Sequence, residues 1–500
     1  MDRMSMTDAG FYFAEGENTP MHVGSVAVFE GPAPSYGDLI RLMMTKLPKV
    51  PRYRQRVRAL PMHLGRPVWM DDDHFQILYH VRHTAVPRPG GAEQLRNLAG
   101  RVLGQRLDMT KPLWEIYLVE GLEDGRWALI SKVHHCMVDG ISGTDLMQMI
   151  FDTDPAATHP EPGAWSPAPA PSTAAVVAGT LQDAVAFTVN QLTSLPPVLG
   201  RIAQAPQELL RLGTTVGSAL PGIARQLARP RARSLNGPIG PHRRWVWTET
   251  SLDAVRQVRK EFGGTVNDVV LTAITRGFRD LLDHRGELTD RLVVRSMVPV
   301  SVRRSQERGT LNNQVSAVFV DLPVAEPDPL ARLASLRRQM DEHKRLNGAL
   351  DARSIIAMGD FVAPTLLALG TRAGVRAGQN LAQTVTTNVP GPPVPLYVLG
   401  HRLAALYAYV PIAAGFRISI GIFSYLRAMT MGINADFDAF PDIDVLADGI
   451  SAGVDELVER AEAAHPTLPA ASTKRTTAKP ATKRRAPAAA GSRRGSARPR

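Results

Sequence analysis

The sequence predicts an α/β protein made of two mixed-sheet domains joined by a long connection. Strand-like and helix-like runs alternate in residues 1–153 and again in residues 236–465. Residues 154–235 start as a Pro/Ala-rich stretch and continue as helical runs broken by prolines, which is typical of a linker with a helical connection. Two such domains imply a cleft between them, and clefts of this kind commonly hold ligands.

The first domain shows both periodicities clearly. Residues 22–31 (HVGSVAVFEG) and 126–133 (RWALISKV) are strand-like runs, the first bounded by turn residues. Residues 36–47 (YGDLIRLMMTKL) and 93–107 (EQLRNLAGRVLGQRL) place apolar side chains three and four positions apart, as helices do. We therefore expect helices packed on a sheet in this domain.

The connection is basic and partly apolar. Residues 176–233 carry six arginines against Asp183 and Glu208. The helical run that begins near residue 181 has one apolar face, with Leu181, Ala184, Val185, Val189 and Leu192. Such a region could lie on a lipid surface or pack against the two domains, and the sequence leaves both alternatives open.

The second domain repeats the alternation of helices and strands. Helical spacing covers residues 251–262, 264–282, 328–346 and 443–463. Strand-like runs cover residues 291–302, 314–324, 384–390, 417–425 and 428–436.

The net charge of +11 is concentrated at the end of the chain. Residues 471–500 contain ten Lys and Arg and no Asp or Glu, whereas the preceding residues hold 48 basic and 47 acidic groups. Ala, Pro, Ser, Thr and Gly fill the remaining positions, so residues 466–500 cannot form a core and are expected to be disordered. This tail suits an anionic membrane surface or nucleic acid, or it is a solubilising extension.

Composition excludes several classes of protein. A single cysteine rules out a disulfide framework and most cysteine-based metal sites. The N-terminus has no basic stretch followed by an apolar one, so no secretory signal is expected. The most apolar run, residues 406–423, contains Pro411 and Arg417 and is a poor candidate for a membrane span. We expect a soluble or peripheral cytoplasmic protein.

The run HHCMVDG, residues 134–140, has the strongest chemical character. It follows an apolar strand and precedes a helix expected near Ser142 to Thr144, and α/β proteins often expose reactive groups at such junctions. A metal site is disfavoured because adjacent side chains in a strand point to opposite faces, and the chain has no HExxH motif. A Cys136 nucleophile is conceivable, but a lone cysteine is usually apolar filler. A plain strand end is the remaining alternative.

General-base catalysis fits this run best. One imidazole titrates near neutrality and can take a proton from a hydroxyl nucleophile. Asp139, four residues after His135, can fix the turn, and Gly140 permits a backbone conformation closed to other residues.

HHCMVDG resembles the HHxxxDG motif of CoA-dependent acyltransferases, and its surroundings resemble the bacterial wax ester synthase/diacylglycerol acyltransferase family in its actinobacterial triacylglycerol synthase branch. The resemblance covers about residues 4–462 and implies two domains like those of chloramphenicol acetyltransferase. The similar runs occur in the family's order: TPMHVGSVAVFE, PLWEIYLVEGLEDGRWALISKVHHCMVDG, LNGPIGPHRRW, GTVNDVVLTAI, MVPVSVR, NNQVSAVFVDLP and TTNVPGP.

The resemblance implies direct acyl transfer in a tunnel between the domains. His135 would be the general base that takes the proton of diacylglycerol, or of a long-chain alcohol, while its oxygen attacks the thioester of acyl-CoA, the co-substrate. Asp139 would be structural, with Arg303 as our guess for its partner, His134 would shape the pocket, and Gly140 would support the turn. No metal or other cofactor is implied.

Further supporting residues also come from the resemblance. Asn267 and Asp268 match the Asn-Asp motif at a helix start, where Asp268 either caps the helix or supports the site, and the Asn267 amide could donate to the thioester oxyanion. Pro112, Leu113 and Trp114 match the PLW motif, for which packing beside the site is the default interpretation. The implied location is cytoplasmic, peripheral at the inner membrane or at lipid droplets.

Three places depart from the family pattern, and one of them is Cys136, which stands where the family usually has a small residue such as Ala. Residues 424–427 read SYLR where the family often has Ser-Tyr-x-Gly, and Ala408 replaces a common proline. These departures put acceptor preference in doubt. The alternatives are another acyltransferase of the same fold, such as a condensation domain, and a non-catalytic protein that binds lipid surfaces or nucleic acid through its tail. The chain shows no adenylation or carrier module, which disfavours the condensation alternative.

Overall fold

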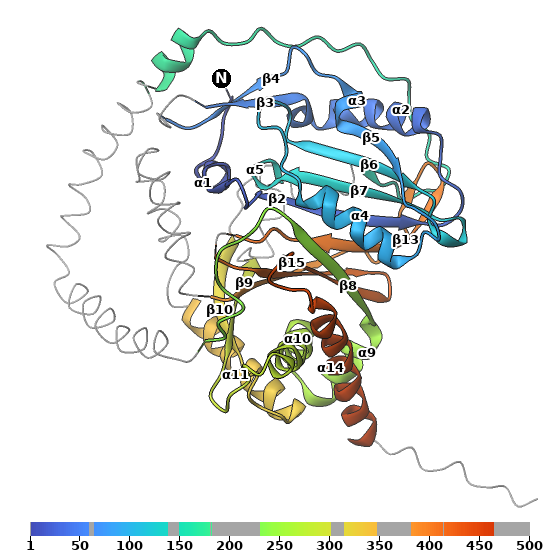
Figure 1. Ribbon diagram of the computed structural model, residues 1–500. Helices are drawn as coiled ribbons and strands as arrows, with labels where there is room; N and C mark the ends of the chain where they lie inside the picture. Colours follow the sequence, from blue (N-terminus) through green and yellow to red (C-terminus); the bar gives the residue numbers. More distant parts are fainter. Residues whose placement is uncertain are drawn as a thin grey trace, which may run out of the picture.

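Two six-stranded mixed sheets, each covered by helices, form the frame of the protein in the computed structural model (Figure 1). The structure describes residues 2–59, 65–138, 150–180, 182, 231–301, 315–347, 382–413 and 415–464. The α/β class with two mixed sheets is confirmed. The helical connection expected after residue 182 and the tail expected at residues 466–500 lie outside the described residues, so both stay predictions.

The first sheet has the strand order β12-β13-β2-β7-β6-β5, and only the β5–β6 pair is parallel. Its strands are β2 (His22–Phe29), β5 (Val81–Ala85), β6 (Trp114–Glu120), β7 (Trp127–His134), β12 (Tyr397–Val398) and β13 (His401–Tyr409). Helix α4 (Ala92–Gly104) packs on one face, and α1 (Met6–Ala14) and α2 (Tyr36–Lys46) pack on the other. The strands expected at residues 22–31 and 126–133 and the helices expected at residues 36–47 and 93–107 are thereby confirmed.

The second sheet has the order β10-β9-β11-β14-β15-β8, with β11 parallel to both of its neighbours. Its strands are β8 (Arg243–Ser251), β9 (Val294–Ser301), β10 (Val315–Leu322), β11 (Thr384–Pro390), β14 (Ile418–Tyr425) and β15 (Ala428–Asp436). The helices of this half are α9 (Leu252–Phe262), α10 (Val266–His284), α11 (Pro329–Asn347) and α14 (Ile443–Ala464). A large apolar core between helices and sheet explains the strong periodicity in the sequence.

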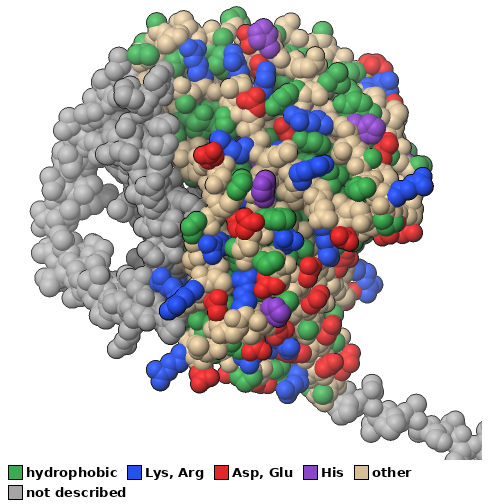
Figure 2. All heavy atoms as spheres, in the orientation of Figure 1, with side chains coloured by type: hydrophobic (Ala, Val, Ile, Leu, Met, Phe, Trp, Pro, Cys, Tyr) green, Lys and Arg blue, Asp and Glu red, His purple; other side chains and the backbone are tan. Residues whose placement is uncertain are grey.

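Smaller elements complete the described chain. They are β1 (Asp2–Arg3), β3 (Gln55–Arg58) and β4 (Val68–Asp71), which form a third sheet, the short helices α3 (Ile77–His80) and α5 (His135–Val138), and the 3₁₀ turns η1 (Leu47–Lys49), η2 (Pro51–Arg54) and η4 (Glu123–Gly125). None of the helices in the described ranges has both the length and the apolar character needed to cross a bilayer. On the face shown in Figure 2, basic and acidic side chains are interspersed, in keeping with the near-neutral composition before the tail.

Strand β13 crosses from the second half of the chain into the first sheet, where it pairs with β2. It passes over the paired residues Gly421 of β14 and Gly432 of β15. A Cβ atom on Gly432 would overlap the carbonyl oxygen of Ala408, so the two sheets approach too closely there for a side chain. This crossing fixes the first sheet against the second. No local pattern in the sequence indicates this pairing, because β13 and β2 are far apart along the chain.

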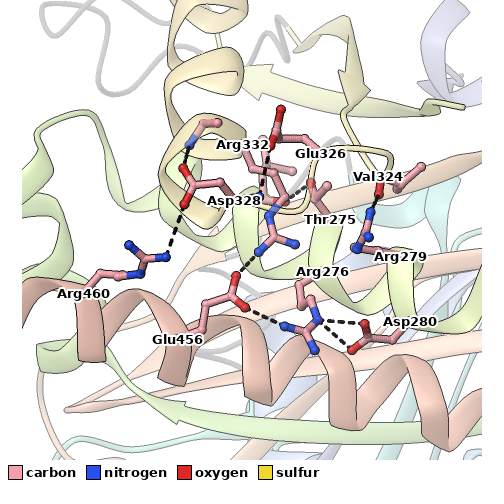
Figure 3. Close-up of polar contacts among 12 residues, drawn as sticks. Thr275, Arg276, Arg279, Asp280, Val324, Glu326, Asp328, Arg332, Glu456 and Arg460 are labelled. Atoms are coloured by element: carbon pink, nitrogen blue, oxygen red, sulfur yellow. Dashed lines mark hydrogen bonds and ion pairs between the residues drawn. The ribbon is translucent and has the colours of Figure 1, made fainter. Parts of the chain in front are cut away.

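An ion-pair cluster joins the helices of the second half (Figure 3). Arg276 on α10 contacts Asp280 at 2.7 Å and Glu456 of α14 at 2.5 Å. The fully buried Arg332 of α11 also pairs with Glu456, so one carboxylate serves guanidinium groups from two helices. Burial, together with the nearby positive charges of Arg276 and Arg279, lowers the pKa of Arg332 to about 10.

Candidate active site

The two adjacent histidines lie at the junction between β7 and α5, in the interior of the first sheet. His134 is the last residue of β7, and its backbone N–H donates to the Leu113 carbonyl at 2.9 Å. His135 is the first residue of α5, and its N–H donates to the Met21 carbonyl at 2.8 Å. Backbone contacts to segments on both sides therefore hold the junction in place.

His135 presents a neutral, half-buried imidazole. Its ring stacks on Phe11 of α1 with 3.8 Å between ring centroids. Nδ1 is buried and makes no hydrogen bond to another residue of the described chain. Burial, and then the neighbouring His134, lower the pKa of His135 to about 4. The ring is consequently unprotonated at neutral pH and able to accept a proton.

His134 has different surroundings, because polar groups hold both of its nitrogens. The Cys136 backbone N–H donates to Nδ1 at 3.2 Å, and the Cys136 Sγ lies 3.0 Å from the same atom. An accepting Nδ1 places the ring proton on Nε2, which lies 3.5 Å from Oε2 of Glu15. The ring is 1 % exposed. His134 is thus held as a fixed wall of the junction rather than presented to a ligand.

Glu15 follows α1 and connects His134 to the surrounding structure. Burial alone would raise the pKa of Glu15, but interactions with His134, the Met21 N–H and Arg106 outweigh it and hold that pKa below its ordinary value. The Arg106 Nε donates to Oε1 at 3.2 Å, and the Met21 N–H donates to Oε2 at 2.5 Å. A carboxylate held in this way stays ionised and fixes the orientation of His134.

The PLW run lies beside the histidines and serves packing. Trp114 is 1 % exposed, stacks on His80 with 4.7 Å between centroids, and donates its Nε1–H to the Tyr53 carbonyl at 2.8 Å. Leu113 is fully buried, and its carbonyl receives the His134 N–H. Trp114 also donates its backbone N–H to the carbonyl of Pro112 at 2.9 Å.

Asn267 and Asp268 lie at the start of α10, in the second half. Asp268 forms a capping box with Thr265: its Oδ2 accepts the Thr265 N–H at 2.7 Å, and Thr265 Oγ1 accepts the Asp268 N–H at 3.2 Å. Oδ1 of Asp268 is buried and has no hydrogen-bond partner among the described residues. Asn267 Oδ1 accepts from Asn388 Nδ2 of β11 at 3.4 Å, which joins the Asn-Asp motif to the TTNVPGP run.

Three of the residues singled out from the sequence, Asp139, Gly140 and Arg303, lie outside the described residues, as does the helix expected near Ser142 to Thr144. Their roles stay predictions. Phe11 and Glu15, in contrast, contact the histidines but were not singled out. Neither has a spacing relation to residues 134–140, and only the tertiary fold brings them together.

Comparison with known proteins matches two domains of one protein family to most of the chain. Residues 4–270 match the wax ester synthase/diacylglycerol acyltransferase catalytic domain, and residues 311–458 match the C-terminal domain of the same family. The chain is 34% identical over 470 residues to a probable diacylglycerol O-acyltransferase, tgs1, of Mycobacterium tuberculosis, covering 92% of this chain and 96% of that protein.

Solved structures show the same fold. The wax ester synthase/diacylglycerol acyltransferase from Marinobacter aquaeolei VT8 is similar with a TM-score of 0.65 at 24% identity, covering 92% of this chain and all of that one. A trichothecene 15-O-acetyltransferase from Fusarium sporotrichioides gives a TM-score of 0.55 at 13% identity, covering 92% and 94%. The expected two-domain acyltransferase architecture is confirmed. The chain belongs to the wax ester synthase/diacylglycerol acyltransferase family and is an acyltransferase of that type.

Proposed function

We propose that the protein transfers an acyl group from acyl-CoA to the free hydroxyl of diacylglycerol, giving triacylglycerol, with long-chain alcohols as further acceptors that give wax esters. Family membership and the similarity to the probable diacylglycerol O-acyltransferase of Mycobacterium tuberculosis support this acceptor class. The observation that carries the mechanism is His135, a half-buried imidazole whose low pKa keeps it neutral at the strand–helix junction.

In the proposed reaction His135 acts as general base. It removes the proton of the acceptor hydroxyl while the oxygen attacks the thioester carbonyl of acyl-CoA. The tetrahedral intermediate then collapses, the C–S bond breaks, and the imidazolium returns its proton to the departing CoA sulfur. No covalent acyl-enzyme is needed. Because burial disfavours the imidazolium, the proton is returned readily once the ester has formed.

Other residues support this chemistry in the proposal. His134 and Glu15 hold the junction, and Asp139 and Gly140 shape the turn that follows, with Arg303 as the partner of Asp139. The Asn267 amide donates a hydrogen bond to the developing oxyanion, and Asp268 holds the start of α10.

The proposed place of action is a lipid surface, peripheral at the inner membrane or at lipid droplets, where both acyl substrates concentrate. The basic residues 471–500 would strengthen contact with an anionic surface. Deleting them should reduce co-sedimentation with anionic vesicles and leave turnover on detergent-dispersed substrate unchanged. If the deletion instead weakens nucleic-acid binding and leaves vesicle binding unchanged, the tail binds nucleic acid.

The decisive experiment is an acceptor panel. Purified full-length protein is mixed with a long-chain acyl-CoA and, separately, diacylglycerol, a long-chain alcohol or an amine, and both released CoA and the acylated product are measured. Diacylglycerol should give triacylglycerol. The proposal fails if no hydroxyl acceptor yields product, and faster transfer to the amine would favour a condensation-type enzyme.

Cys136 provides a test of the nucleophile. Replacing it with alanine should keep turnover within about threefold of wild type, an effect of roughly 0.6 kcal/mol on the barrier. The reason is that the Cys136 backbone N–H, which donates to His134 Nδ1, remains in the variant, while the Sγ contact to the same nitrogen is lost. Turnover as low as that of a His135 variant would instead make the thiol the nucleophile. The measurement is CoA release at saturating substrate.

A further inference from the structure

A groove of about 850 Å³ lies between α4 and β8, where the two halves of the protein meet (Figure 1). Its walls combine five arginines with three carboxylates. The arginines are Arg96, Arg101, Arg106, Arg243 and Arg244. A concave site with this excess of guanidinium groups attracts anions.

Three of the five arginines have partners within the protein. Arg96 pairs with Asp444 at 3.6 Å, and Arg106 pairs with Glu15 at 3.2 Å. Arg243 is buried and donates from Nη1 to two backbone carbonyl oxygens, each at 2.7 Å. Arg243 keeps its positive charge, because carbonyl oxygens are neutral. Arg101 and Arg244 are the two arginines of the lining that remain.

Arg101 and Arg244 have no carboxylate partner among the described residues. Arg101 is exposed on α4. The guanidinium of Arg244 lies 4.1 Å from the centroid of the Phe437 ring, and its Nε is buried without a hydrogen-bond partner in the described chain. A guanidinium that lies over an aromatic ring can still make bidentate contact with a phosphate through its N–H groups.

The groove adjoins the histidine junction. Arg106 lines the groove, and its Nε donates to the same Glu15 carboxylate that lies 3.5 Å from His134 Nε2. One ion pair therefore separates the groove wall from the residue that precedes the proposed base.

We propose that this groove holds the phosphate-bearing end of acyl-CoA, with Arg101 and Arg244 as its phosphate-binding residues. The inference rests on the proposed function, because an acyl-CoA donor carries several phosphate charges at the end remote from its thioester. Phosphate contacts of this kind supply binding and anchor the donor while the acyl end reaches His135.

The test is calorimetric binding of CoA, 3′-dephospho-CoA and pantetheine to the full chain, with no acceptor present. Arg101→Gln and Arg244→Gln should each weaken CoA binding about tenfold, the effect of losing a charge-assisted contact. Pantetheine, which lacks these phosphates, should bind all variants equally. Arg402→Gln is the matched control, since Arg402 is an exposed arginine on β13 that pairs with Glu30 away from the groove.

Arg244→Lys is a control for misfolding, because it keeps the positive charge and removes only the planar guanidinium. We expect this variant to lose less CoA affinity than Arg244→Gln. Unchanged CoA affinity in the glutamine variants would overturn the proposal. So would an equal loss for pantetheine. Vesicles of phosphatidylcholine with and without phosphatidic acid form a second arm: if Arg244→Gln loses binding to the acidic vesicles alone, the groove takes lipid phosphate instead. Since no turnover is measured, a failure of the acyl-transfer proposal would be visible separately.

Discussion

Replacing His135 with alanine should lower kcat for acyl transfer by about 10³-fold, within the range that a general base contributes. The fold should survive, because the ring is only half-buried and the hydrogen bond from the His135 N–H to the Met21 carbonyl belongs to the backbone. The measurement is CoA release and ester formation with saturating acyl-CoA and acceptor, alongside circular dichroism to establish folding.

A matched histidine variant separates this effect from general damage. His83 lies on β5, is 42% exposed and pairs with Glu120 on the surface, so His83→Ala should keep wild-type turnover. If His135→Ala retained more than about a third of wild-type kcat, a loss of under 1 kcal/mol in barrier height, His135 would not be the base.

The pH profile tests the same residue without a mutation. A pKa of about 4 keeps His135 neutral throughout the neutral range, so kcat/KM should stay level from about pH 8 to about pH 6. The rate should fall only as the pH drops through this pKa and the imidazole becomes protonated. An unperturbed imidazole, with a pKa of about 6.5, would leave roughly a quarter of the base neutral at about pH 6. A fall of that size in folded protein would contradict the buried environment of His135.

Glu456→Ala should destabilise the protein by about 3 kcal/mol, at the lower end of the cost of breaking a buried ion pair. Glu456 neutralises Arg276 of α10 and the fully buried Arg332 of α11 (Figure 3). Without it, the guanidinium of Arg332 stays in the helical layer beside the positive charges of Arg276 and Arg279. The lower end applies because the Glu456 side chain is 21% exposed. Urea-induced unfolding, followed by circular dichroism, measures the change.

Two further variants establish the cause. Asp341→Ala removes an exposed pair with Lys344 on α11 and should cost no more than about 0.5 kcal/mol. Adding Arg332→Met to Glu456→Ala should recover part of the lost stability, because the uncompensated buried charge is then gone. If the double variant were no more stable than Glu456→Ala, charge burial would not be the reason.

The sequence predicted the elements whose signal is local. Helix α4 and strand β7 follow from spacings within a single run of residues, and so does the helix start at which a capping role was one of the two alternatives for Asp268. The pairing of β13 with β2 has no such signal, because strand partners distant in sequence are chosen by packing and not by local pattern. Long-range contacts therefore account for what could not be anticipated.

In the candidate site, too, the local features could be predicted from the sequence and the long-range contacts could not. Adjacent histidines after an apolar strand were visible as a reactive junction, and the family resemblance singled out His135. The partners that distinguish the two rings could not be predicted. Phe11, which stacks on His135, lies on α1, and Glu15, which lies beside His134, directly follows that helix. No periodicity links them to residues 134–140, so only the assembled tertiary structure shows them.

The crossing of β13 into the first sheet has a consequence for how the protein is made. A ribosome releases β2, β5, β6 and β7 long before residues 401–409, so the outer edge of β2 stays without its partner strand until most of the chain has been synthesised. Open strand edges recruit other chains. A nascent or prematurely terminated polypeptide ending before residue 397 would therefore expose that edge to aggregation. The last hundred residues thus supply the strand that covers the edge of β2, in addition to completing the second sheet.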